Sequence, residues 1–188
     1  MKPDIIVVYD RFTPGPDGGP TQWMSATAPS VTVKGDSFLV QQNKSRLRGR
    51  VLLPAVAKIS TVNARQTPPF DGLFGGSQGL LLVKPEAAQQ DRCVEYLVAM
   101  RVGGKTLPAL DATALIDAEQ VGVRIGGEAG TSEIRFRRRG ALGGSVQTAT
   151  LRNGRSLDLT EGVEDTYRHW PQHKSWTKEE RFSFFRAR

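Results

Sequence analysis

The 188-residue sequence predicts an all-β protein, an antiparallel β-sandwich with a short irregular or helical C-terminal tail. Short runs of β-branched and aromatic residues recur at intervals of roughly 8–12 residues, which is typical of strands in sandwiches. Twenty glycines and eleven prolines separate these runs. Several runs also alternate apolar and polar residues, as strands with one buried face do.

The first predicted strand covers residues 4–10, where four consecutive apolar residues, Ile5 to Val8, precede Tyr9. Such a run suits a buried sheet and not a frayed chain end. The other predicted strands have the same residue preferences and are bounded by Gly, Pro, Asn or Asp. They are residues 30–34, 37–42, 45–53, 57–61, 79–84, 92–101, 112–117, 121–125, 132–138, 145–151 and 155–159.

Three connections have a turn chemistry of their own. Lys34-Gly35-Asp36 suits a tight hairpin with Gly35 at positive φ. Asn153-Gly154 is the strongest hairpin signal in the chain, because both residues tolerate the left-handed turn. Residues 66–78 are too rich in Pro and Gly for regular structure, so a long loop is expected there.

Composition indicates a globular chain, and we expect residues 1–162 to form the sandwich and residues 163–188 to form a basic, aromatic tail. Hydrophobic residues make up 38% of the chain and charged residues 24%, and no apolar run approaches the ~20 residues of a membrane span. The start, Lys2-Pro3-Asp4, does not look like a signal peptide. The net charge of +7 favours an anionic partner, whether nucleic acid, acidic polysaccharide or membrane surface.

Arginines alternate with apolar residues in two predicted strands. Period-two geometry places Arg46, Arg48 and Arg50 on one face of their strand, and Arg135 and Arg137 on one face of another. One interpretation is a pair of solvated outer faces. The other is a cationic stripe for a polyanion, which Lys44 and Arg152 would extend if their strands were neighbours.

Catalytic signals are sparse. His169 and His173 have the i, i+4 spacing of two metal ligands on a helix, with Asp165 as a third candidate, but Pro171 between them argues against that helix. Two surface histidines are the alternative. Cys93 lies in an apolar stretch and is expected to be a buried thiol. No glycine-rich segment has the strand-to-helix setting of a phosphate loop.

The tail interleaves aromatic and basic residues. Trp170 and Trp176 alternate with Arg168, Lys174 and Lys178. Such a pattern can stack on sugar rings or bases while its cations meet their charges. The alternative is that the aromatic residues pack against the sandwich or another domain.

The order of these segments resembles the C-terminal β-sandwich region of the heparinase II/III-like polysaccharide lyases, over roughly residues 3–160. The resemblance rests on the strand Ile5 to Arg11, the segment Thr21 to Ser25, and a strand like Ser37 to Gln42. It continues with a "rL…vLLP" element at residues 46–54, with residues 80–85 and 91–98, and with a hairpin at residues 120–125.

The resemblance implies a β-sandwich fold and the absence of the catalytic helical domain from this sequence. Members of that family carry an N-terminal helical toroid before the β-structure, so this chain looks like the back end of a lyase. Their tyrosine base and its histidine and asparagine partners come from upstream segments. Some members hold a metal with an aspartate equivalent to Asp10 and a histidine just after the Trp segment. Residues 23–27 lack that histidine, so we expect no metal and no other cofactor, and expect Asp10 to pair with Arg11 or to cap a turn.

The function expected from the sequence is that of an accessory, non-catalytic domain or subunit of a bacterial heparinase-like lyase. It would contact an anionic polysaccharide or the catalytic helical domain, and it would be periplasmic if it belongs to an exported lyase. No membrane partner is expected, and nucleic acid is a less favoured partner than either the polysaccharide or another protein subunit. The alternative is a structural or interaction protein that binds another subunit through its basic faces and aromatic tail. The polysaccharide contacts would be Arg46, Arg48, Arg50, Arg135 and Arg137, with tail contacts from Trp170 and Trp176.

Overall fold

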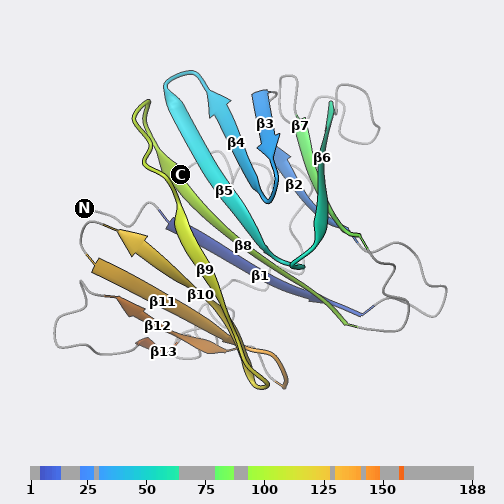
Figure 1. The fold of residues 1–188 in the computed structure, drawn as a ribbon, viewed down its shortest axis with the longest axis vertical. Helices are drawn as coiled ribbons and strands as arrows, with labels where there is room; N and C mark the ends of the chain where they lie inside the picture. Colours follow the sequence, from blue (N-terminus) through green and yellow to red (C-terminus); the bar gives the residue numbers. More distant parts are fainter. Residues whose placement is uncertain are drawn as a thin grey trace, which may run out of the picture.

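The computed structural model describes residues 5–13, 22–27, 30–63, 79–86, 93–127, 130–140, 143–148 and 157–158. These residues form strands, turns and short connections, and the predicted fold class is confirmed. Three antiparallel sheets pack together as a β-sandwich (Figure 1). Among these residues none belongs to a helix that could span a bilayer.

Sheet A, with five strands, is the layer that the other two sheets contact. Its outermost strands are β1 and β3, and every neighbouring pair is antiparallel. In spatial order it consists of β1 (Ile5–Phe12), β8 (Val94–Gly103), β5 (Ser45–Leu53), β4 (Ser37–Gln42) and β3 (Ser30–Lys34).

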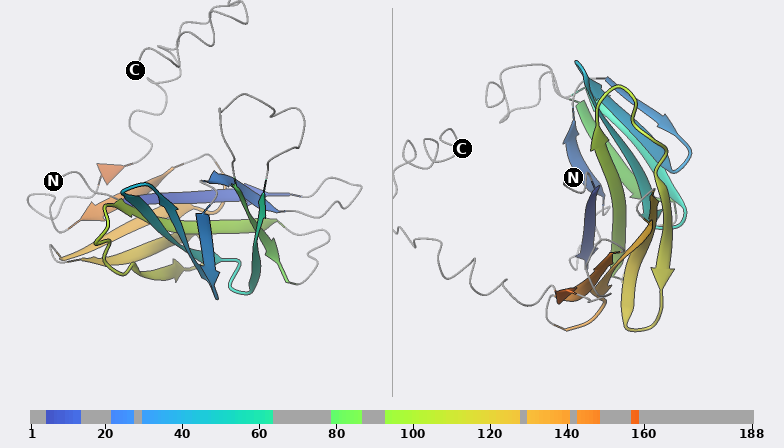
Figure 2. Two further views of the ribbon diagram at one scale, coloured as in Figure 1. Left: turned by 90° about the horizontal axis from the view of Figure 1, so that it is seen from above. Right: turned by 90° about the vertical axis from the view of Figure 1, so that its left-hand side faces the viewer.

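Sheets B and C lie on opposite faces of sheet A, and Figure 2 shows the closely spaced layers from two further directions. Sheet B has three strands, in the order β2 (Trp23–Thr27), β7 (Gly79–Pro85) and β6 (Ala57–Asn63). Sheet C has five strands, in the order β13 (Leu157–Asp158), β12 (Gly144–Thr148), β11 (Gly130–Arg137), β10 (Gln120–Gly127) and β9 (Asp111–Ile116).

Strand β8 contributes to two cores because successive side chains point to opposite faces of a sheet. Tyr96 and Val98 are fully buried against sheet B, together with Leu81 and Val83 of β7. Leu97 and Ala99 point the other way and are fully buried in the core that sheet A shares with sheet C. A strand that is buried on both faces reads as a nearly continuous apolar run, as residues 96–100 do.

The strand predictions agree closely with the structure, and the predicted hairpin at Gly35 is confirmed by a φ of 58° between β3 and β4. A second left-handed residue, Asn43 with φ 53°, turns β4 into β5. Strand β2 was not predicted as a strand, because residues 23–27 contain few β-branched residues. The predicted hairpin at Asn153 and the loop at residues 66–78 lie outside the described residues.

Candidate anion-binding groove

The three arginines of β5 share one face of sheet A, as the alternation predicts. Arg48 and Arg50 oppose Arg101 and Ala99 of β8, and Ala99 belongs to the core with sheet C. The arginine face is therefore the face of sheet A that sheet C partly covers. The three arginines have intermediate exposure, and the side chain of Arg50 is 40% exposed, so this face is only partly solvated.

Two of these arginines bind backbone of the segment after β8: Arg46 binds the connection to β9, and Arg50 binds β9 itself. Arg46 Nη1 donates to the carbonyl oxygen of Lys105 at 2.7 Å, and Arg50 Nη1 donates to that of Ala112 at 3.0 Å. Arg50 also donates from Nε to Asp36 Oδ2 at 2.8 Å. Hydrogen bonds from a charged donor are among the stronger ones. Arg46 and Arg50 thus hold this connection and the edge of sheet C against sheet A.

Arg48 differs from its neighbours. It lies directly opposite Arg101 in the β5–β8 register, where two like charges repel. Arg101 donates to the carbonyl oxygens of Ala109, at 2.9 Å, and Gly126, at 3.4 Å. For Arg48 the structure records no hydrogen bond or ion pair within the described part of the chain. Its guanidinium therefore remains available to an external anion.

A shallow groove of about 330 Å³ lies over this face. This volume is near the lower limit of the ~300–1,000 Å³ typical of ligand sites. Sheet A forms its floor, and the connection before β9 forms one wall. Two lysine or arginine side chains, Lys34 and Arg48, have no partner recorded among the described residues. The lining residues are Thr32, Lys34, Ser37, Phe38, Leu39, Arg48, Gly49, Arg50, Ala109 and Leu110.

Asp36 is the acidic residue that balances Arg50 at the rim of this groove. Burial acts to raise the pKa of Asp36, but hydrogen bonds from Arg50 and Ser37 outweigh it and lower that pKa. The carboxylate is therefore ionised and paired at neutral pH. It leaves Lys34 and Arg48, two of the three cations of the lining, without a neutralising carboxylate among the described residues, so the groove carries net positive charge.

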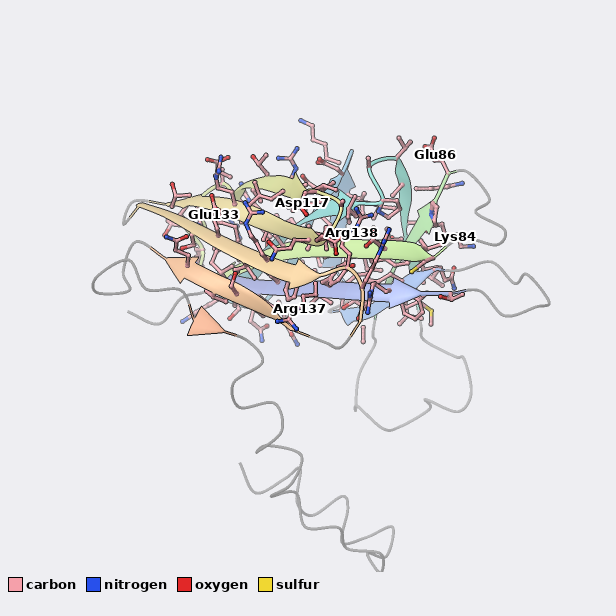
Figure 3. All side chains as sticks on the ribbon, turned by 90° about the horizontal axis from the view of Figure 1, so that it is seen from below. Lys84, Glu86, Asp117, Glu133, Arg137 and Arg138 are labelled. Atoms are coloured by element: carbon pink, nitrogen blue, oxygen red, sulfur yellow. The ribbon has the colours of Figure 1, made fainter. Side chains whose placement is uncertain are left out.

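The second predicted arginine pair lies on a different surface. Arg135 and Arg137 point away from sheet A, because Ile134 and Phe136, which alternate with them along β11, pack into the core with sheet A. Arg135 forms ion pairs with Glu133, at 3.4 Å, and with Asp117, at 3.6 Å. Arg137 is exposed, as Figure 3 shows.

The layer of sheet C separates this outer surface from the groove, so the two arginine sets do not form one stripe. Lys44 is exposed in the turn between β4 and β5. Arg152 lies outside the described residues. The predicted stripe is therefore corrected to a groove lined by Arg48 and Arg50, with Arg46 on the same face of sheet A but outside the lining, and a separate face with Arg135 and Arg137.

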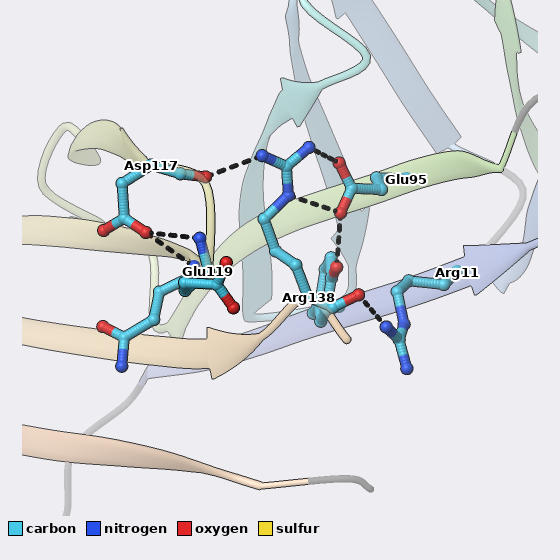
Figure 4. A network of polar contacts seen from close by, with 7 residues as sticks. Arg11, Glu95, Asp117, Glu119 and Arg138 are labelled. Atoms are coloured by element: carbon cyan, nitrogen blue, oxygen red, sulfur yellow. Dashed lines mark hydrogen bonds and ion pairs between the residues drawn. The ribbon is translucent and has the colours of Figure 1, made fainter. Parts of the chain in front are cut away.

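A partly buried polar cluster, which the sequence interpretation missed, joins sheets A and C (Figure 4). Arg138 Nε and Nη2 donate to the two oxygens of Glu95 at 3.0 and 2.5 Å, and Tyr9 Oη donates to Glu95 Oε1 at 2.6 Å. Arg11 donates to the carbonyl oxygen of Arg138. A signal was present in the sequence. Glu95 and the buried Leu97 are two residues apart and so lie on the same face of their strand, and a charged side chain on a buried face needs a partner.

The cluster has the electrostatics of a structural link. Burial acts to raise the pKa of Glu95, but hydrogen bonds from Arg138 and Tyr9 outweigh it, so that pKa is lowered. Burial and the neighbouring Glu95 carboxylate raise the pKa of Tyr9. Burial also raises the pKa of Tyr96. Both tyrosines are therefore protonated at neutral pH, which is the wrong state for a catalytic base.

Two expectations at single residues are wrong. Asp10 does not pair with Arg11: its Oδ2 accepts a hydrogen bond from Trp23 Nε1 at 2.9 Å, while Arg11 reaches across to the end of β11. Cys93 is exposed instead of buried. It precedes the first residue of β8 and has the parity of Glu95, so it lies at the margin of the face that sheet C covers.

The remaining site predictions concern the tail and a metal site. Trp170, Trp176, His169 and His173 lie outside the described residues, as does Tyr167. Within the described ranges, no group of three or more His, Cys, Asp and Glu side chains could hold a metal ion.

Fold and groove together define a class: an antiparallel β-sandwich with a basic, partly apolar groove on one face of its central sheet. Comparison with protein-family models and with curated proteins gives no match. The resemblance to the heparinase II/III-like lyases therefore stays a prediction.

Proposed function

We propose that this β-sandwich is a non-catalytic binding domain for an anionic polysaccharide, and that it serves as an accessory domain or subunit of a heparinase-like lyase. The observation that carries the binding role is the position of Arg48. It lies in the groove, opposite Arg101 and without a carboxylate partner among the described residues. An anion between the two guanidinium groups would relieve their repulsion.

The chemistry of the groove suits carboxylate or sulfate groups on a sugar. A guanidinium group can bind either in a bidentate manner, and Lys34 adds a point charge. The hydroxyl groups of Thr32 and Ser37 lie in the lining and can bind sugar hydroxyls. Phe38, the aromatic residue of the lining, is only 3% exposed, so little stacking on a sugar ring is available. Charge therefore dominates recognition, and we expect binding to weaken as salt rises.

The test compares two variants with the same change of net charge. Arg48→Ser removes the groove cation, and Arg139→Ser removes an exposed cation outside the groove. On a heparin column the Arg48 variant should elute at clearly lower salt than the wild type, while the Arg139 variant should shift little. Equal decreases in the elution salt of both variants would mean that retention depends on net charge alone, and the groove proposal would then be wrong.

The nature of the polymer is tested by competition. Soluble heparin, hyaluronan or alginate should displace the protein from the column at low concentration, and neutral dextran should not. Stronger displacement by single-stranded or duplex DNA of matched charge would favour nucleic acid instead. The accessory role is tested by the native mass of the protein from its source, which should include a chain or segment bearing the helical catalytic domain.

A further inference from the structure

The outer face of sheet B is unusually apolar for a sheet face turned away from the core. On the central strand β7, Leu81 and Val83 point inward and are fully buried, while Leu80 and Leu82 point outward. The register places Met24 of β2 beside Leu82, and Val62 of β6 beside Leu80. Met24 is 58% exposed and Val62 is 46% exposed. These four residues, Met24, Val62, Leu80 and Leu82, are called the sheet B patch.

A sheet that faces water on one side normally alternates apolar and polar residues along each strand. The outer face of sheet C follows that rule, since Arg124, Glu133 and Arg135 form ion pairs there. Strand β7 is instead apolar on both faces from Leu80 to Val83, as strands covered on both sides are, and Lys84 is the first charged residue on its outer face. The contrast within one molecule indicates that the sheet B patch is covered by something else.

Charge at one end of the patch limits what that partner can be. Lys58 and Lys84 lie directly opposite each other in the β6–β7 register, on the same face as the patch, and both are exposed. Neither takes part in an ion pair among the described residues. Exposed Glu86 follows Lys84 by two residues but forms no recorded ion pair with either lysine, so an acidic group of a partner near both would relieve their repulsion. Figure 3 shows Lys84 at the sheet B end of the molecule, far from Glu133 and Arg137.

We propose that the sheet B patch is a docking surface for another protein, whose contacting face is apolar at its centre and acidic at the end that meets Lys58 and Lys84. A protein fits better than a lipid bilayer for a geometric reason. Leu80 and Leu82 at the centre of the patch are half-buried, and Met24 and Val62 flank them on a sheet of three paired strands. A sheet face of this kind packs against another protein layer, whereas side chains that enter the interface of a bilayer reach ~5–10 Å into it.

The proposal is tested with two labelled synthetic peptides and the full chain. Both are amphipathic helices with leucines along one face; one carries glutamates beside the leucines, and the other carries lysines at the same positions. In fluorescence anisotropy the acidic peptide should bind at least about tenfold more tightly than the basic one. Changing Lys58→Glu and Lys84→Glu together should reverse that preference.

Further variants separate the patch from general surface charge. Met24→Ser with Val62→Ser should weaken acidic-peptide binding by about tenfold or more. Ile116→Ser, at an apolar residue of β9 that is 54% exposed, should leave it unchanged. Arg48→Ser should also leave it unchanged, because the groove lies on the other face of sheet A. If the Met24 and Val62 variant fails to fold, the peptide preference of the Lys58→Glu, Lys84→Glu variant tests the proposal instead.

Three results would overturn the proposal. The first is equal binding of both peptides, or of neither, by the folded wild type. The second is binding that ignores the Met24 and Val62 changes. The third is sedimentation with vesicles of phosphatidylcholine and phosphatidylserine that is lost in the same variant, which would identify the patch as a membrane contact.

Discussion

Arg138 donates two hydrogen bonds to the carboxylate of Glu95, at 3.0 Å from Nε and 2.5 Å from Nη2, and so joins the end of β11 to the start of β8. The third nitrogen, Nη1, donates to the carbonyl oxygen of Asp117 at 2.7 Å. The side chain of Glu95 is 16% exposed and that of Arg138 is 30% exposed. This pair is thus a polar link between sheets A and C at the margin of their shared core.

Replacing Arg138 should therefore cost much more stability than replacing its neighbour. Arg138→Gln leaves the Glu95 carboxylate with Tyr9 alone, and we expect a loss of about 1.5–3 kcal/mol in the free energy of unfolding. Arg139→Gln changes an exposed side chain and should cost less than ~0.5 kcal/mol. Urea unfolding of both variants measures the difference, and equal midpoints would show that the link contributes nothing.

The same carboxylate predicts a pH dependence. The pKa of Glu95 is lower in the folded protein than its ordinary value of 4.5, so the unfolded chain binds more protons between the two values. Stability should therefore be fully present above pH ~4.5 and should fall as the pH drops through the lower folded value. In Glu95→Gln the acid limb should be shallower than in the wild type. Parallel thermal melts from pH 3 to 7 test this, and superimposable slopes would contradict it.

A third prediction concerns the packing of Gly49 under Phe38. A Cβ atom at Gly49 would lie 2.1 Å from Cζ of the Phe38 ring, which is 3% exposed in the core with sheet B. Gly49→Ala should therefore destabilise the fold by about 1–3 kcal/mol through overpacking. Gly104→Ala is the matched control, because nothing lies within 4 Å of its Cβ position. Combining Gly49→Ala with Phe38→Leu should recover part of the loss.

The local sequence pattern predicted most of the strands, because residue type and alternation along a strand indicate whether each of its faces is buried. The run from Ile5 to Val8 and the Gly35 turn are specified by β-propensity and by φ, which need no knowledge of the tertiary structure. Strand β2 was missed because its five residues have little β-propensity of their own and form a strand through pairing with β7. The face shared by Arg46, Arg48 and Arg50 also follows from period two alone.

What those arginines contact could not be read from the same pattern. The carbonyl groups of Lys105 and Ala112 are brought to Arg46 and Arg50 only when the connection before β9, and β9 itself, lie over sheet A. Cys93 shows the complementary error: an apolar neighbourhood predicts burial, yet the cover provided by sheet C ends before that residue. The alternation of residues along a strand predicts which face of the sheet a side chain lies on. Whether that side chain is buried depends on how far the neighbouring sheet extends over that face.

A fourth prediction concerns elimination chemistry. Cleavage of a uronate by elimination needs a base to remove the C5 proton, and the pKa values of Tyr9 and Tyr96 are raised, not lowered. Incubated alone with heparin, heparan sulfate, hyaluronan or alginate, the chain should produce no unsaturated uronate absorbance in the ultraviolet. Product formation that persists after repurification, and that is lost on Tyr9→Phe, would contradict this expectation.

The last prediction separates the groove arginine from the anchoring arginines on β5. Arg50→Ser removes the hydrogen bonds to Asp36 and to the carbonyl oxygen of Ala112, and we expect it to lower the free energy of unfolding by about 1–2 kcal/mol. Arg48→Ser removes no hydrogen bond recorded among the described residues and should change stability by less than ~0.5 kcal/mol.

Heparin retention of the same two variants should rank in the opposite order to their stability losses. Arg48→Ser should lose most retention while keeping its thermal midpoint, and Arg48→Lys should keep much of the retention because a cation remains. Arg50→Ser should lose thermal stability and keep most of its retention below its unfolding temperature. If one variant loses both properties, or if Arg48→Ser loses neither, then binding and folding do not divide between these two side chains, and Arg48 is not the anion-binding residue of the groove.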